Sequence, residues 1–311
     1  MNIESEQLTP IIDLGPFEGN HLWIKREDLI PFSFGGNKAR KAKLFFQEID
    51  KGKYDCVVTY GSSSSNHCRI VANECCRRGI TCHIISPEEA SEKTFNSQMM
   101  QLFDAKITVV PVENVHDTIE KKINDLKDSG LHPFFIEGGG HGNIGTEAYV
   151  QCYREICKQE EEIGVHFDYI FFASGTGTTH AGLVCGHLIE KDERNIVGIS
   201  IARKNPRGRN VVIDCIRRYL GDVCSDETID NEVVFIDDYT DGYGKKDKKV
   251  LNTILLALKE YGIPLDSTYT GKAFMGMTEY IRGIDRKNIL FIHTGGTPLF
   301  FDVLRNDIDE V

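Results

Sequence analysis

The sequence lacks a membrane-length apolar run, a basic surplus and the cysteine spacing of a metal site. A membrane-spanning helix needs about 20 apolar residues in succession, and no run in this chain approaches that length. The formal net charge of -11 over 311 residues argues against nucleic acid or an anionic membrane surface as the main partner. The N-terminus has neither the basic start nor the apolar stretch of a secretory signal, so we expect a cytoplasmic protein.

The ten cysteines of the chain show no C-x-x-C pattern. Cys75 and Cys76 are adjacent in the sequence, whereas Cys152 and Cys157 are separated by other residues. Most of the cysteines lie in apolar surroundings, where a thiol behaves as a small core residue. We therefore expect reduced, structural cysteines and no bound metal ion.

Short apolar, β-branched runs alternate with amphipathic stretches along most of the chain. This alternation predicts an α/β fold with mainly parallel sheets, helices on both faces and ligands at the carboxyl ends of strands. The expected strands are residues 56–60, 81–85, 107–110, 133–136, 169–173, 196–201, 233–236 and 288–293. The expected helices are residues 39–49, 66–78, 115–126, 145–159, 179–189, 248–261 and 272–281.

Lys38 follows a glycine-rich turn, Gly35-Gly36-Asn37, and opens a predicted helix. The N-terminus of a helix already carries partial positive charge. That position tends to lower the pKa of the lysine ammonium group, which suits an amine that must act as a neutral nucleophile. A surface helix start rich in Lys and Arg is the alternative, and this segment alone does not exclude it.

A run of hydroxyl groups, Ser62-Ser63-Ser64-Ser65, followed by Asn66 and His67, connects an apolar strand to an amphipathic helix. Serine and asparagine are favoured helix N-caps, so a simple cap is one interpretation. One cap needs one such residue, however. The longer polar run therefore favours a ligand site, where side-chain donors and free backbone N–H groups act together.

A second glycine-rich turn, Ser174-Gly175-Thr176-Gly177-Thr178, follows a buried strand and leads into a helix. Its backbone N–H groups and hydroxyls can hold a dianionic phosphate. It is not a Walker loop, because no G-K-[ST] follows. The next strand ends without the acidic residue that a dinucleotide ribose requires, so the pattern favours a monophosphate over a dinucleotide.

These segments together resemble the fold-type II pyridoxal-phosphate family that contains D-cysteine desulfhydrase and 1-aminocyclopropane-1-carboxylate deaminase. The resemblance runs through nearly the whole chain in the family's order, although Tyr269-Thr270-Gly271-Lys272 carries no signal by itself. The G-G-N-K-x-R-K and S-N-H elements are its specific parts. The matching segments are Arg26-Glu27-Asp28-Leu29, Gly35-Gly36-Asn37-Lys38, Ser65-Asn66-His67, the turn at residues 174–178, Asp238-Tyr239, Tyr243-Gly244, Tyr269-Thr270-Gly271-Lys272 and His293-x-Gly295-Gly296.

The resemblance implies a catalytic role for four residues. Lys38 would bind pyridoxal 5′-phosphate as a Schiff base and move a proton at the substrate α-carbon. Ser65 would lie beside the substrate carboxylate or act as the nearby acid or base. Tyr243 would face the substrate, and Tyr269 would stack near the cofactor ring.

The resemblance also implies which residues bind cofactor and substrate. Asn66 would bond the 3′ oxygen of the ring, and Thr270 would meet the pyridine nitrogen. The cofactor phosphate would be bound by the turn Ser174, Gly175, Thr176, Gly177 and Thr178. The substrate would be a small amino acid bound by Ser64, Ser65, His67 and Tyr243.

The family architecture implies a tryptophan synthase β-like fold of two three-layer α/β/α domains. The large cofactor-binding domain would comprise residues 1–42 and 161–311, and the small inserted domain residues 43–160. A homodimer is the implied assembly.

The reaction that the resemblance favours is α,β-elimination, with D-cysteine converted to pyruvate, sulfide and ammonia. The deaminase branch places a glutamate where this chain has Thr270, and a neutral partner makes a weaker electron sink. That sink suits a good β leaving group better than the opening of a cyclopropane ring. One departure widens the choice of substrate, because Ser64 replaces the family's glutamine. Alternatives are the cyclopropane deaminase, a cysteate lyase, a racemase and, from another class, a nicotinamide-dependent dehydrogenase.

Overall fold

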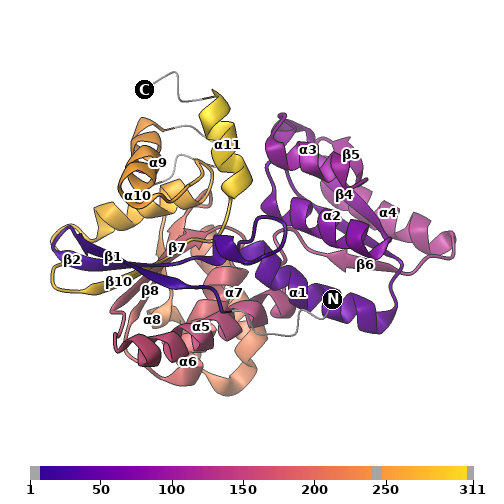
Figure 1. Cartoon of the computed structure of the whole chain (residues 1–311). Helices are drawn as coiled ribbons and strands as arrows, with labels where there is room; N and C mark the ends of the chain where they lie inside the picture. The colour runs from indigo at the N-terminus through magenta and orange to yellow at the C-terminus, as the bar shows by residue number, and fades with distance from the viewer. Residues whose placement is uncertain (1–7, 240–241, 243–246, 307–311) are drawn as a thin grey trace. The chain divides into compact units, whose positions relative to one another are not determined.

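The computed structural model describes residues 8–239, 242 and 247–306, and the chain divides into two compact units (Figure 1). Unit 1 comprises Met1–Asn37 and Thr146–Thr297, and unit 2 comprises Lys38–Gly145 and Pro298–Val311. Each unit has its own sheet. The domain boundaries expected from the family, at residues 42 and 160, remain a prediction about the cofactor-binding and inserted domains.

Unit 1 is built on a six-stranded sheet in the order β1-β2-β10-β7-β8-β9. The pair β1–β2 is antiparallel, and every other neighbouring pair is parallel. The central strand β7 is almost wholly buried, as expected for a parallel strand covered on both faces. The strands are β1 (Ile11–Phe17), β2 (Asn20–Lys25), β7 (Tyr169–Ser174), β8 (Asn195–Ser200), β9 (Val234–Ile236) and β10 (Asn288–Ile292).

Helices cover both faces of this sheet (Figure 1). A Cβ atom at Gly198 of β8 would clash with His180 on α6, whereas Ile199, the next residue, contacts Gly276 on α10. Because successive strand residues point to opposite faces, α6 and α10 lie on opposite sides. The helices described in unit 1 include α5 (Asn143–Ile163), which begins at the end of unit 2, α6 (Thr178–Glu190), α7 (Arg207–Leu220), α8 (Asp226–Glu232), α9 (Lys248–Tyr261) and α10 (Thr270–Tyr280), with short 3-10 turns at Glu27–Leu29 and Gly221–Val223.

Unit 2 is built on a four-stranded parallel sheet in the order β5-β4-β3-β6. Its strands are β3 (Cys56–Tyr60), β4 (Thr81–Pro87), β5 (Lys106–Val110) and β6 (Pro133–Ile136). Its helices include α1 (Asn37–Gly52), α2 (Asn66–Arg78), α3 (Phe95–Leu102), α4 (Val115–Asp128) and α11 (Thr297–Asn306), of which α1 and α11 each have their first residue in unit 1. Two 3-10 turns, Glu88–Ala90 and Val112–Asn114, complete the connections.

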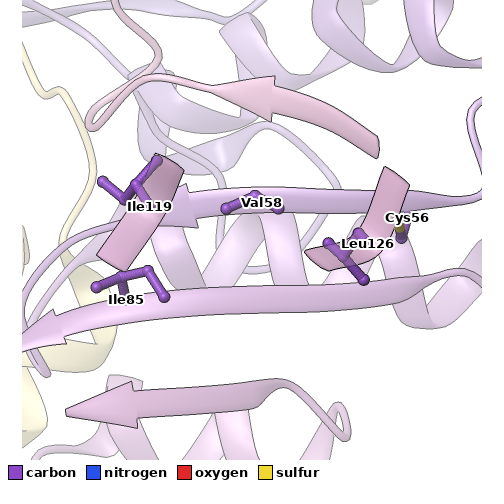
Figure 2. Close-up of a cluster of buried hydrophobic side chains, with 5 residues drawn as sticks. All are labelled: Cys56, Val58, Ile85, Ile119 and Leu126. Carbon is purple, nitrogen blue, oxygen red and sulfur yellow. The ribbon is translucent and has the colours of Figure 1, made fainter. Parts of the chain in front are cut away.

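The core on one face of this sheet joins β3, β4 and α4 (Figure 2). Cys56 and Val58 point from β3 toward α4, which places Ile119 and Leu126 against them. Ile85 of β4 completes the cluster. The alternation of residues in β3 and the helical spacing in α4 therefore meet in one apolar layer.

The expected fold class is confirmed, and each expected strand and helix is present with small shifts of its ends. Several elements were not expected, namely β1, β2, α3, α7, α8 and α11. The strand β1 contains Gly15 and Pro16 and is only partly buried, so it has neither the composition nor the alternation that identify a strand. The helix α3 has only about two turns, and polar and apolar residues are mixed in its sequence.

Candidate active site

Two glycines fix the loop that precedes Lys38. A Cβ atom at Gly35 would clash with the carbonyl oxygen of Asp28, and one at Gly36 would lie 2.7 Å from the carbonyl oxygen of Thr294. Both glycines have positive φ, +58° and +94°, which other residues adopt at a cost. The N–H of Asn37 donates to the same Thr294 carbonyl at 2.9 Å. The start of α1 is thereby held in one position.

Lys38 is the second residue of α1, and its Nζ donates to the carbonyl oxygen of Gly139 at 2.8 Å. Burial lowers the pKa of the Lys38 ammonium to about 8, although Cys68 and Lys41 act in the opposite direction. The direction agrees with the sequence prediction, but desolvation is the main cause. With this pKa about one tenth of the amine is neutral at pH 7, far more than for an ordinary lysine, and nucleophilic attack on an aldehyde requires the neutral form.

Gly139 belongs to a loop that the sequence analysis missed. The run Gly138-Gly139-Gly140 follows β6, and β6 pairs in parallel with β3. A Cβ atom at Gly138 would lie 2.7 Å from the ring of Tyr60, so the loop passes closely over the end of β3. In the sequence, the three consecutive glycines after a predicted strand were the feature that could have identified this loop. The hydrogen bond from Lys38 Nζ to the Gly139 carbonyl could not be read from spacing alone.

The serine run leaves the carboxyl end of β3 and turns into α2. Ser65 is the N-cap of α2, and its Oγ accepts a hydrogen bond from the N–H of Cys68 at 3.1 Å. A Cβ atom at Gly61 would lie 2.9 Å from Ser65 Oγ and 2.8 Å from Cys68 Sγ, so the turn is tight. Ser65 thus acts as the helix cap. As the acceptor in this bond, its Oγ uses a lone pair, so the hydroxyl proton of Ser65 can be donated to another acceptor.

His67 and Ser64 have partners within unit 2. The hydroxyl of Thr59 donates to the carbonyl oxygen of Ile136 at 2.7 Å, so it accepts from His67 Nε2 at 2.9 Å. Burial, reinforced by the charges of Lys38 and Lys41, lowers the pKa of His67 well below its usual value. Ser64 Oγ lies 3.1 Å from Ser62 Oγ. Substrate binding by His67 and Ser64 remains a prediction.

The predicted phosphate turn lies in unit 1 between β7 and α6. Gly177 is the N-cap of α6, with φ of +107° and no side chain that could cap the helix. The first-turn N–H groups of such a helix suit an anion. Arg203 donates to the carbonyl oxygen of Gly175 at 3.1 Å from the end of the neighbouring strand, and Thr178 is buried while Thr176 is partly exposed.

Ser174 ends β7 and lies beside a buried histidine. Its Oγ is 3.2 Å from Nδ1 of His180 on α6. Burial lowers the pKa of His180 to about 3, so the ring is neutral under the turn. His180 therefore supports the turn by packing and hydrogen bonding and adds no positive charge to it.

Thr270, the first residue of α10, is bonded to a buried carboxylate that the sequence analysis missed. Thr270 Oγ1 donates to Asp266 Oδ2 at 2.7 Å and accepts from the N–H of Asp266 at 2.9 Å. The N–H of Tyr269 donates to Asp266 Oδ1 at 2.7 Å. Burial raises the pKa of Asp266, while these bonds oppose the rise. In the sequence, the position of Asp266 shortly before the start of α10 was the feature that could have identified it.

The structure therefore groups the predicted residues within each unit. In unit 2, Lys38 is electrostatically coupled to Cys68 and His67. Both lie in the first turn of α2, next to Ser65 and Asn66. In unit 1, the turn after β7 and the start of α10 carry the others. Tyr243 lies outside the described residues.

Among the described residues, no group of three or more His, Cys, Asp or Glu side chains could hold a metal ion. All ten cysteines have free thiols, and most are buried. No described helix is long and apolar enough to cross a membrane.

Comparison with known proteins identifies the class. The pyridoxal-phosphate dependent enzyme family matches residues 4–295. A D-cysteine desulfhydrase of Yersinia enterocolitica is 31% identical over 304 residues, covering 93% of this chain and 90% of that protein. A D-cysteine desulfhydrase of Serratia proteamaculans is 30% identical over 301 residues, with the same coverage.

Solved structures agree with this class. The structure of an ACC deaminase homologue has a TM-score of 0.86 and 29% identity, covering 98% of this chain and 94% of its own. The cysteine synthase of Entamoeba histolytica, at 17% identity and a TM-score of 0.67, shares the fold. The fold is that of the fold-type II pyridoxal-phosphate enzymes. The chain belongs to the pyridoxal-phosphate dependent enzyme family, and its cofactor is pyridoxal phosphate.

Proposed function

We propose that the protein is a lyase that performs α,β-elimination on a small amino acid, with D-cysteine as the favoured substrate and pyruvate, sulfide and ammonia as products. The observation that carries the proposal is Lys38, whose pKa is lowered to about 8 at the start of α1. The two D-cysteine desulfhydrases, each about 30% identical over 93% of this chain, support the choice of substrate.

Pyridoxal phosphate supplies an electron sink for the negative charge that forms at the substrate α-carbon. Lys38 is proposed to anchor the cofactor and to take the α-proton through Nζ. Loss of that proton and of the β-thiol, with uptake of one water, converts cysteine into pyruvate, ammonia and sulfide. The low pKa of Lys38 matches a base that works near neutral pH.

The remaining predicted residues are proposed to bind and orient. Asn66 would donate to the ring oxygen, and Ser65 would serve the substrate with its hydroxyl proton. Tyr243 and Tyr269 are retained as proposed substrate and ring contacts. The turn Ser174, Gly175, Thr176, Gly177 and Thr178 would hold the phosphate, which the absence of a capping side chain at Gly177 supports.

Thr270 separates the leading proposal from a second one. A cyclopropane deaminase is the alternative, because the ACC deaminase homologue is also similar to this chain. Thr270 is neutral and already bonded to Asp266, so it offers the pyridine nitrogen no negative charge of its own. A nicotinamide-dependent dehydrogenase is not supported, because the family matches nearly the whole chain.

An absorption spectrum with defined amino acids tests the proposal. The purified protein, supplied with pyridoxal phosphate, should show a visible band that borohydride removes while labelling the peptide that contains Lys38. D-cysteine should then yield pyruvate and sulfide, and Lys38→Ala should yield neither. Release of α-ketobutyrate from the cyclopropane amino acid would support the second function instead. If neither pyruvate nor α-ketobutyrate is released, the cofactor assignment still holds but the proposed lyase activity is contradicted.

A homodimer and a cytoplasmic location are also proposed. The resemblance to the family supports the homodimer, and the absence of signal features at the N-terminus is the basis for the location. Light scattering of the purified protein tests the first, and a mass of one chain would contradict it.

A further inference from the structure

Asn96 links the start of α3 to the polar run before α2. It is the second residue of α3 and is completely buried. Its Nδ2 donates to the carbonyl oxygen of Ser64 and to Oδ1 of Asn66, each at 2.9 Å. No sequence motif singles out Asn96, because its partners lie about thirty positions away along the chain.

These contacts determine which way the Asn66 amide faces. A backbone carbonyl only accepts hydrogen bonds, so the Asn96 atom that faces Ser64 must be the NH₂ group. The Asn66 atom facing that group must then be its oxygen. Arg69 supports the same assignment, because its guanidinium, which only donates, lies 3.5 Å from Asn66 Oδ1. Two donors from different elements therefore fix the orientation of one amide.

The carbonyl end of the Asn96 side chain indicates that its NH₂ group is what this position requires. Asn96 Oδ1 is buried and has no hydrogen-bond partner among the described residues. Buried polar atoms without partners are uncommon and destabilise the folded state. A leucine would fill similar space without that cost but could not donate to Ser64 and Asn66.

The start of α3 is held in place without Asn96. Thr94 and Ser97 form a reciprocal capping box. Thr94 Oγ1 donates to the carbonyl oxygen of Ser63 at 2.7 Å, and the N–H of Phe95 donates to the carboxylate of Asp302 at 3.1 Å. Replacing Asn96 therefore tests its amide while the helix start keeps its other anchors.

We propose that Asn96 is a positioning residue that holds Oδ1 of Asn66 and so leaves the NH₂ group of Asn66 as the donor to the cofactor ring oxygen. The inference rests on the proposed role of Asn66. If the Asn66 amide turned over, its oxygen would face an oxygen of the cofactor, and an attractive contact would become repulsive.

The test compares Asn96→Leu and Asn96→Asp with Ser97→Ala, which weakens the capping box of the same helix but has no bond to Asn66. The measured quantities are the dissociation constant for pyridoxal phosphate, the position of the visible band across pH, and the thermal midpoint. We expect both Asn96 variants to bind the cofactor about tenfold more weakly and to shift the band, since one charge-assisted bond is lost. Ser97→Ala should lower only the thermal midpoint.

A second comparison keeps the inference testable if Asn96→Asp folds poorly. In the background of Asn66→Ala, Asn96→Leu should cause no further loss of cofactor affinity, because Asn96 acts through Asn66. Additive losses, or Asn96 variants that behave like Ser97→Ala, would overturn the inference. A wild-type protein that binds no pyridoxal phosphate would instead refute the cofactor site itself, which distinguishes the two failures.

Discussion

Two side chains near Lys38, those of Cys68 and His67, remain uncharged at neutral pH. Burial raises the pKa of the Cys68 thiol to about 12, and the pKa of His67 lies well below its usual value. Cys68 and Lys41 raise the pKa of Lys38, but their effects are smaller than that of burial, which lowers it. Desolvation therefore dominates at Lys38, and the amine loses its proton more easily than an exposed lysine does.

The first prediction concerns the pH dependence of cofactor uptake by the protein freed of cofactor. Only the neutral amine attacks the aldehyde, and burial moves the pKa of Lys38 from 10.5 to about 8. The uptake rate should fall about tenfold per pH unit below that value and level off above it. Stopped-flow absorbance measures the rate. A rate that keeps rising up to the ordinary lysine pKa of 10.5 would contradict the lowered pKa.

The second prediction concerns the bond between Thr270 and Asp266. Thr270→Val keeps the shape of the side chain but leaves Asp266 Oδ2 with one donor fewer and the N–H of Asp266 without its acceptor. The free energy of unfolding should fall by about 1–3 kcal/mol, the range for an unsatisfied buried polar group. Urea unfolding of the cofactor-free protein measures it.

Thr270→Ser is the matched control for that prediction, since it retains the hydroxyl and should lose much less stability. Thr270→Glu is informative in a different way. It would place a second carboxylate beside a buried one whose pKa is already raised by burial, and like charges repel strongly there. Equal stability of the Val and Ser variants would show that the Asp266 bond contributes little.

At the scale of elements, α5 packs closely against α6, which is the helix that follows the predicted phosphate turn. A Cβ atom at Gly182 of α6 would clash with the carbonyl oxygen of Thr146 and with Tyr149 on α5, and one at Gly186 would clash with Tyr153. Gly182 and Gly186 lie one turn apart on the same face of α6. The close packing sets the position of the helix whose first residues follow the turn at Gly177.

The third prediction follows from this packing. Gly182→Ala should reduce the free energy of unfolding by about 1–3 kcal/mol, the usual cost of overpacking, because the new methyl group meets backbone atoms that cannot rotate away. It should also weaken phosphate binding, measured as inorganic phosphate competing with the cofactor. Gly79→Ala is the control at the C-cap of α2, where φ is +69° and nothing lies within 4 Å of a Cβ atom. That variant should destabilise the protein without changing phosphate binding.

At the scale of the whole molecule, local motifs could be read from the sequence and distant partners could not. The segments around Lys38, Asn66 and Gly177 each combine a strand end, a turn and a helix start within a few residues, so periodicity and turn chemistry reveal them. Asn96 and Asp266 act through three-dimensional contacts with residues that no spacing rule connects. In the antiparallel pair β1–β2, the strand β1 was missed because it carries a glycine–proline pair and is only partly buried.

The last prediction concerns the stability of the cofactor-bound protein. A ligand that binds only the folded state stabilises it by about 2.7 kcal/mol at a concentration one hundred times its dissociation constant. If the 311 residues unfold together, this corresponds to a rise of about 4 °C in the melting temperature. Each compact unit has its own sheet, so the two units can unfold in separate transitions. Calorimetry should therefore measure the rise for each unfolding transition.

Pyridoxamine phosphate separates the two proposed contributions to that rise. It presents the same phosphate to the turn at residues 174–178 but has no aldehyde for Lys38. We therefore expect a smaller rise with pyridoxamine phosphate than with pyridoxal phosphate in the wild-type protein, and equal rises in Lys38→Ala. A larger rise with pyridoxal phosphate in Lys38→Ala would mean that another amine reacts with the cofactor. No rise with either compound would mean that the glycine-rich turn does not hold the phosphate, since that contact does not need the lysine.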